Sequence, residues 1–155
     1  MAISQLPSLV PLFVRLVAGE DALPTTGAGI LALRESVRRD LESLLNTRRP
    51  PLSWPVALKE LDGSILAYGI GDIAGRHFEA AAERSAFCTE VASAIARFDS
   101  RLKAVSVRLT EESPGRGFGL VIEAVLDADQ LPLALTFGTK LDPALQRMSV
   151  EEILS

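Results

Sequence analysis

The sequence has 155 residues, of which 48% are hydrophobic and 23% charged, with a formal net charge of −4 and a pI near 5.1. This length fits one ordinary domain, and the apolar fraction is high enough for a real core, which excludes the class of intrinsically disordered chains. Because phosphate binding needs a net basic surface or a basic stripe, the acidic balance argues against nucleic acid as the main partner.

Residues 1–19 contain an apolar run that does not fit an export signal. The run from Leu9 to Ala18 is interrupted by Pro11 and Arg15, and no basic segment precedes it, whereas a secretory signal begins with positive charge and continues with an unbroken apolar stretch. No run approaches the roughly 18 apolar residues that span a bilayer. We therefore expect a cytoplasmic protein without direct membrane insertion. We expect residues 1–19 to form an amphipathic docking segment with one apolar face: Leu9, Leu12, Phe13 and Leu16.

Residues 20–29 gather Gly, Pro and Thr, which is typical of a linker, and residues 30–155 are predicted to form a single domain. The first strong helix is predicted from Ile30 to Arg48, because apolar residues recur along one stripe at three- and four-residue steps: Ile30, Leu33, Val37, Leu41 and Leu44. Pro50 and Pro51 end this helix.

The middle of the chain is less regular. Residues 55–61 are predicted to form a short helix opened by a proline, and Asp62-Gly63 is a turn signal. A second long helix is predicted from Glu79 to Phe98, with an apolar stripe of Phe87, Val91, Ala94, Ile95 and Phe98.

The pattern then changes from helical to period-two. Val105, Val107 and Leu109 alternate with polar residues and predict a strand with one wet face, and the apolar run from Phe118 to Leu126 predicts a central strand. Alternation over 133–137 predicts a third strand, and the tail over 142–155 adds either a fourth short strand or a helical end. Helices followed by a meander predict an α+β fold. In it, two main helices pack on one face of a three- to four-stranded, mainly antiparallel sheet.

The search for catalytic chemistry finds little. His77 is the only histidine and Cys88 the only cysteine, so a zinc site of the usual Cys/His composition cannot be built and no catalytic triad is indicated. Cys88 falls inside the second helical pattern, which favours a buried, inert thiol. Gly69-Ile70-Gly71 begins like a dinucleotide fingerprint but lacks its strand–loop–helix frame, so it indicates a turn. The acidic residues lie mostly opposite the apolar stripes, as on a solvated face, and not as the poised pair that glycoside hydrolysis needs.

The most specific stretch runs from Ser36 to Pro50 and reads SVRRDLESLLNTRRP. It closely resembles the helix signature of the TssE family of type VI secretion baseplate proteins. That family also includes wedge proteins of contractile phage tails, and it was once labelled lysozyme-related. The signature usually reads Arg-Arg-Asp-Leu-Glu-Trp-Leu-Leu-Asn-Thr-Arg, and Ser43 replaces its tryptophan here.

Three further stretches resemble the family in the expected order. Residues 64–75 look like its Tyr-Gly-Leu-Pro-Asp-Phe-Ser-Gly loop, and residues 97–102 occupy the place of its Arg-Phe-Glu-Pro-Arg-Leu element. Residues 122–126 and 135–139 resemble its last strands. The resemblance therefore covers roughly residues 30–140.

The resemblance implies a structural role without enzymatic activity, metal, cofactor or small-molecule substrate. In this family the subunit joins the baseplate wedge with TssF and TssG, and its sheet offers an edge to the first ring of the TssB/TssC sheath, which seeds polymerisation. An exposed strand edge carries unpaired N–H and C=O groups that an incoming strand can satisfy. The first and third strands are the candidates for this edge.

The Glu-Pro-Arg element is the family's proposed wedge contact. Asp99 and Arg101 keep its acid and its base, so an inter-subunit ion pair is feasible, although Asp99 is one methylene shorter and Ser100 does not fix the backbone as proline does. Alternatively, Asp99-Ser100 simply ends the helix. The polar residues of the helix signature either contact a partner or brace this turn: Arg38, Arg39, Asp40, Asn46 and Arg48.

The sequence thus predicts a baseplate subunit that works through protein contacts. Two alternatives stay open. One is a peptidoglycan hydrolase, as the old family label suggests, and the other is the equivalent wedge protein of a contractile phage tail.

Overall fold

The computed structural model describes residues 26–73, 76, 78–111, 118–128, 131–142 and 147–153. The helical elements are α2 (Thr26–Asn46), η2 (Val56–Gly63), η3 (Ile65–Ala67) and α3 (Ala81–Phe98), where η marks a 3₁₀-helix. The strands follow as β1 (Leu102–Glu111), β2 (Phe118–Ala128), β3 (Leu131–Asp142) and β4 (Arg147–Glu152).

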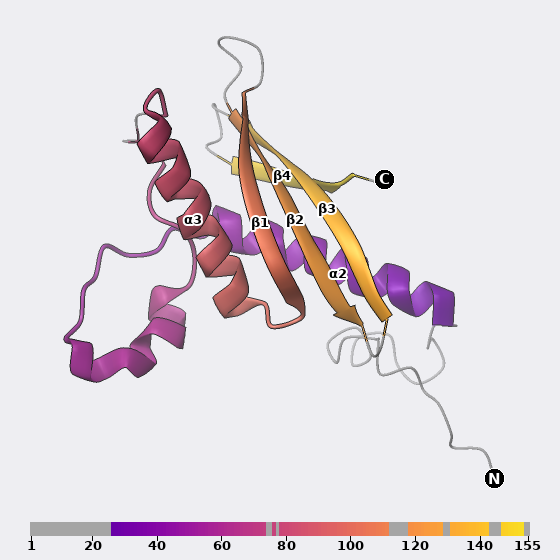
Figure 1. Ribbon diagram of the computed structural model, residues 1–155. Helices are drawn as coiled ribbons and strands as arrows, with labels where there is room; N and C mark the ends of the chain where they lie inside the picture. Colours follow the sequence, from indigo (N-terminus) through magenta and orange to yellow (C-terminus); the bar gives the residue numbers. More distant parts are fainter. Residues whose placement is uncertain are drawn as a thin grey trace.

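The four strands form one antiparallel sheet in the order β1-β2-β3-β4, so each strand pairs with the next along the chain. Both α-helices share one core with a single face of this sheet (Figure 1). This confirms the predicted α+β fold and the interior position of β2. The proposal of the third strand as an edge is wrong, because the tail forms β4 and pairs with β3. Within the described residues, the sheet edges are therefore β1 and β4.

The core follows the predicted stripes. Alternate residues of the strands and every third or fourth residue of the helices are buried together: Leu33, Val37, Leu41, Leu44, Phe87, Val91, Ala94, Ile95, Leu120, Ile122, Leu126, Leu135 and Phe137. Full burial of one such large apolar side chain stabilises by about 1.5–3 kcal/mol relative to exposure. This shared core therefore holds the helices against the sheet.

The boundaries of α2 differ from the prediction of Ile30–Arg48. The helix begins at Thr26, inside the segment predicted as a linker, and ends at Asn46. It ends early because the backbone after Asn46 pairs with a distant segment: Ile70 N–H donates to the Thr47 carbonyl oxygen at 3.0 Å, and Arg49 N–H donates to the Ile70 carbonyl oxygen at 2.8 Å. The predicted turn at Gly69 adjoins this pairing, and the φ of Gly69 is +104°.

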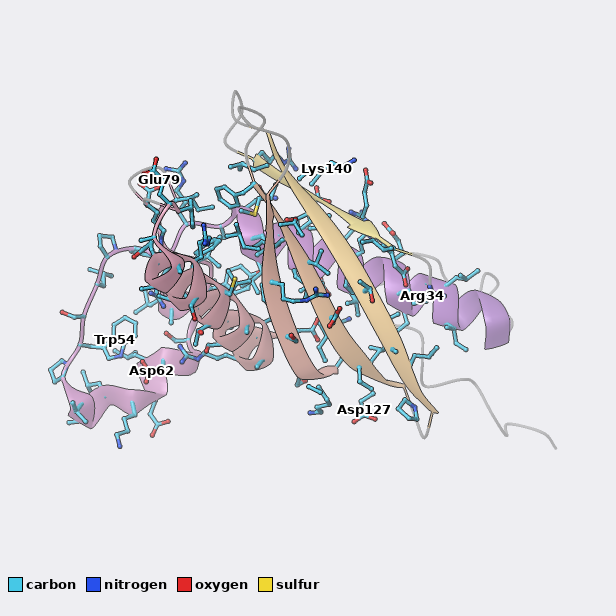
Figure 2. All side chains as sticks on the ribbon, turned by 45° about the horizontal axis from the view of Figure 1, so that its top comes forward. Arg34, Trp54, Asp62, Glu79, Asp127 and Lys140 are labelled. Atoms are coloured by element: carbon cyan, nitrogen blue, oxygen red, sulfur yellow. The ribbon has the colours of Figure 1, made fainter. Side chains whose placement is uncertain are left out.

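Residues 51–66, which we call the arm, project to the side of α3 away from the sheet (Figure 1). The predicted short helix is the 3₁₀-helix η2, preceded by Pro55 and broken by non-helical angles at Leu58. None of its residues is buried. Figure 2 shows Trp54 and Asp62 on this arm, where Trp54 Nε1–H donates to Asp62 Oδ1 at 3.1 Å.

β1 contains a bulge that the alternation pattern did not predict. Between Lys103 and Ser106 the pairing with β2 shifts, so Ala104 and Val105 together occupy the place of one residue. Ala104 has a φ of +50°, in the left-handed region. Bulges of this kind bend an edge strand and increase its twist.

Several predictions concern residues outside the described ranges. These are the docking segment with Leu12, Phe13 and Leu16, the first part of the linker, and His77. They remain predictions.

Candidate partner-binding interface

Asp99 and Arg101 bind each other within the turn that joins α3 to β1. Arg101 Nε donates to Asp99 Oδ1 at 2.8 Å and Arg101 Nη2 donates to Asp99 Oδ2 at 2.6 Å, a bidentate pair. The Asp99 carboxylate also accepts from the Arg101 backbone N–H at 3.1 Å, and Asp99 is only 8% exposed. Asp99, which is shorter than the family's glutamate, therefore pairs with Arg101 of the same turn.

The same guanidinium ties this turn to the middle of α2. Arg101 Nη2 donates to Asp40 Oδ2 at 2.6 Å, and Arg101 Nη1 donates to Ser36 Oγ at 3.3 Å. The bonds to Asp99, and then those to Asp40, raise the pKa of Arg101 above its usual range against the opposing effect of burial. The sequence left two roles open for Asp40, partner contact or bracing of the turn, and in the structure Asp40 braces the turn through Arg101. A partner contact at Asp99 or Arg101 remains a proposal.

Two further residues of the helix signature close the outer edge of β4. The Asn46 side-chain amide donates to the Met148 carbonyl oxygen at 2.8 Å, and Asn46 Oδ1 accepts from the Met148 N–H at 2.8 Å. Arg38 Nη1 donates to the Val150 carbonyl oxygen at 3.1 Å. Met148 and Val150 are alternate residues, as expected for the groups that an edge strand turns away from its neighbour.

Arg39 and Arg48 are the exposed arginines among the predicted partner-binding residues of the signature. Arg39 lies 3.4 Å from Glu35 on the same helix, and Arg48 lies 3.3 Å from Asp72. All four side chains are about half exposed, so these ion pairs contribute little to stability. Both arginines lie where a partner could reach them.

The edge of β1 borders a groove instead of a row of capping side chains. Small residues of α3 line this groove together with Val107: Ser85, Cys88, Thr89, Ala92, Ser93 and Ala96. In Figure 1, α3 runs alongside β1. The backbone of Leu109 hydrogen-bonds the Cys88 thiol, whose pKa is raised by burial and lowered to a smaller extent by that bond. Cys88 is half-buried, which corrects the expectation of a buried thiol.

The arm is an apolar surface that sequence reasoning missed. Five of the seven large hydrophobic side chains found exposed among the described residues belong to it: Leu52, Val56, Leu58, Ile65 and Leu66. The arm is nevertheless held in place, because Arg97 Nη1 donates to the Asp62 carbonyl oxygen at 3.2 Å. Two residues after the arm, the ring of Tyr68 meets the ring of Phe98 edge to face. Exposed apolar clusters of this kind mark protein-binding sites. Apolar residues without helical or strand periodicity, flanked by prolines, were the available sequence signal.

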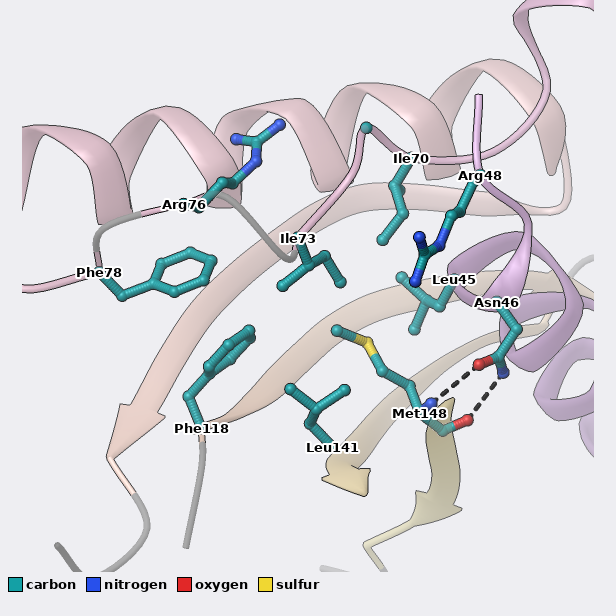
Figure 3. A pocket seen from close by; sticks show the side chains of 11 residues that line it. Leu45, Asn46, Arg48, Ile70, Ile73, Arg76, Phe78, Phe118, Leu141 and Met148 are labelled. Atoms are coloured by element: carbon teal, nitrogen blue, oxygen red, sulfur yellow. Dashed lines mark hydrogen bonds between the residues drawn. The ribbon is translucent and has the colours of Figure 1, made fainter. Parts of the chain in front are cut away.

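A cavity of about 250 Å³ lies where the end of α2, the segment after η3 and the sheet meet (Figure 3). Its lining is mostly apolar: Leu45, Ile70, Ile73, Phe78, Phe118, Leu141 and Met148. The polar residues of the lining are engaged elsewhere, because Asn46 holds Met148, Arg76 pairs with Glu90 and Arg48 with Asp72. Among the described residues that line the cavity, each polar side chain thus has a partner within the protein.

The described residues contain no group of three or more His, Cys, Asp or Glu side chains that could hold a metal ion. Asp40 and Asp99 approach one guanidinium, whereas glycoside hydrolysis needs two acids that flank an open substrate site. Among the helices in the described part of the chain, none is long and apolar enough to cross a membrane.

These features define a small α+β protein whose polar side chains hold its elements together and whose exposed features are a strand edge and an apolar arm. Residues 31–131 match the family described as "Baseplate wedge protein gp25". The chain therefore belongs to this baseplate wedge family, which is the TssE family, and the resemblance predicted from its motifs is confirmed. Membership supports a structural role among protein partners in a baseplate. No curated protein and no solved structure matches the chain.

Proposed function

We propose that this protein is a non-enzymatic, cytoplasmic baseplate subunit of a type VI secretion system. It joins the wedge formed with TssF and TssG and seeds polymerisation of the TssB/TssC sheath. The membership in the wedge family supports the structural role. The contrast between the two sheet edges carries the proposal for how the sheath is engaged.

The sheath contact is assigned to β1. The side chains of Asn46 and Arg38 hydrogen-bond outward backbone groups of β4, at Met148 and Val150. By contrast, β1 borders a groove lined by small side chains of α3. A strand added to β1 would lie in this groove and satisfy outward N–H and C=O groups of the edge strand around Val107. The bulge at Ala104 would limit the added strand to the following part of β1.

The wedge contact is assigned to the arm and to the turn beside it. Arg97, which holds the arm, lies two residues before Asp99 in the element that resembles the family's wedge contact. Val56 and Ile65 are 79% and 87% exposed, so their apolar side chains gain most from burial in an apolar groove of TssF or TssG. The exposed Arg39 and Arg48, and Asp99 with Arg101, are proposed to complete this contact at its polar rim.

The sheath assignment is tested by filling the groove. Ser93→Trp places a large side chain in the groove from an exposed position of α3, and Ala82→Trp makes the same change on an exposed part of α3 outside the groove. We expect Ser93→Trp to lose sheath polymerisation from purified TssB/TssC while it still recovers TssF/TssG. Equal polymerisation from both variants would move the sheath contact away from β1.

The wedge assignment is tested by co-purification. We expect Ile65→Asp to lose recovery of a TssF/TssG complex, and we expect Leu31→Asp to retain it, because Leu31 is also exposed but lies on α2. Loss in both variants, or in neither, would contradict the role of the arm. If the parent protein recovers no wedge or sheath subunit, the proposed secretion-system assembly is contradicted, although the family and the fold stand. If it recovers phage-tail wedge proteins instead, the phage-tail alternative is favoured.

A further inference from the structure

Side chains of α2 hydrogen-bond the backbone groups that β4 turns away from the sheet. Asn46 provides one donor and one acceptor to Met148, the same pair that a residue of a neighbouring strand would provide (Figure 3). Arg38 binds the Val150 carbonyl oxygen and Arg34, one turn earlier on α2, binds Glu152 with an Nη2–Oε1 distance of 2.5 Å. Asn46 and Arg38 thus stand in the place of a fifth strand, and the Arg34–Glu152 pair adds a side-chain contact between α2 and β4.

The direction of the neighbouring bonds supports this interpretation. Ile153 N–H donates to the Thr136 carbonyl oxygen at 2.8 Å, so the backbone of Ile153 faces β3. Since backbone groups alternate in direction along an antiparallel edge strand, those of Val150 and Met148 face away from β3. Without α2's side chains they would form a short row of unpaired groups, which is a template for pairing with another chain.

We propose that Asn46 and Arg38 prevent a second copy of this chain from pairing with β4, so that the protein does not dimerise through this edge. A second copy is the occupant against which closure is needed, because it presents an identical β4 and antiparallel pairing of the two would extend the sheet symmetrically. The inference concerns the isolated chain and does not depend on the identity of any wedge or sheath partner.

The test compares two double variants of α2. Asn46→Ala with Arg38→Ala removes both caps. Arg39→Ala with Ser43→Ala is the control, because it changes two exposed residues of α2 and keeps both caps. We expect the first variant to double its mass in light scattering at micromolar concentration, and we expect the second to keep the mass of the parent. Amide exchange at Met148 should accelerate by up to about tenfold in dilute samples of the first variant, the factor for the loss of one hydrogen bond.

A rescue distinguishes edge pairing from general unfolding. Ser149 is exposed on β4 opposite Lys140, so Ser149→Glu adds a favourable pair within the chain and places like charges together when two β4 strands meet. Added to the first variant, this change should restore the mass of the parent. If the first variant fails to fold, Asn46→Asp alone, which keeps the acceptor for Met148 N–H, serves in its place. A folded variant that lacks the caps and keeps the parent's mass overturns the proposal, as does association that Ser149→Glu leaves unchanged.

Discussion

At the scale of single residues, the acid and the base of the Asp99-Ser100-Arg101 element perform an internal task. The bidentate pair sits at the end of α3, and the same guanidinium reaches Asp40 on α2. Three elements thus meet at one side chain that is half-buried. A variant of Arg101 would therefore change the fold and any partner contact together, which is why the wedge contact is better tested on the arm.

We expect Asp99→Asn to lower the free energy of unfolding by about 2–3 kcal/mol, because it removes one partner of a nearly buried, charged hydrogen-bonded pair. Asp40→Asn should cost no more than about 1 kcal/mol, since Asp40 is 57% exposed and its pairing is screened by water. Urea unfolding measures both. Equal losses would contradict the view that Asp99 is the main partner of Arg101.

Gly69 is required by a close approach of two backbone segments. Its φ is +104°, and a Cβ built there would lie 2.3 Å from the Thr47 carbonyl oxygen. We expect Gly69→Ala to destabilise by about 2–3 kcal/mol through backbone strain and the displaced pairing of Thr47 with Ile70. Gly63→Ala is the matched control, because nothing lies within 4 Å of its Cβ position. Its thermal unfolding should change little, and a comparable loss at Gly63 would show that the effect at Gly69 is not steric.

At the scale of elements, periodicity predicted what local sequence determines. The stripes on α2 and α3, the alternation on β1 and β3 and the apolar run of β2 all contribute residues to the core or pack against it. The strand β4 carries only two apolar residues, Met148 and Val150, so its sequence signal was too short to separate a strand from a helical end. The role of Asn46 could not be predicted, because its partner lies 102 residues away and nothing local marks an edge cap.

The bulge in β1 gives a prediction at this scale. Ala104 pays for a left-handed conformation that glycine adopts freely, so Ala104→Gly should raise the free energy of unfolding by about 0.5–1 kcal/mol. Ala134→Gly, at an exposed position inside β3, should lower it by a similar amount because glycine weakens a regular strand. Denaturant midpoints distinguish the two signs, and a loss at both positions would contradict the bulge geometry.

At the scale of the whole molecule, the candidate surfaces lie in different places. The arm projects beyond α3 on the side away from the sheet (Figure 1). The groove is instead lined by residues of α3 and by Val107 of β1. A subunit that links a wedge to a sheath needs two such separate surfaces. The family motifs led to the wedge family, but the arm was missed because exposure is a property of the folded chain. An apolar residue on the arm and one in the core look alike in sequence.

A pair of variants can test whether the docking segment, residues 1–19, serves partner binding or the stability of the fold. Among the described residues, the buried core extends from Leu33 to Val150 and includes residues of both α-helices and all four strands. We predict that this core closes without Leu12, Phe13 or Leu16. We expect Leu12→Asp with Phe13→Asp to leave the thermal unfolding midpoint unchanged and to reduce recovery of the wedge complex. Ser4→Asp with Ala18→Asp adds the same charge to the same segment away from the predicted apolar face, and it should retain recovery. A fall in the midpoint would show instead that these residues complete the core, and unchanged recovery in both variants would remove residues 1–19 from the contact.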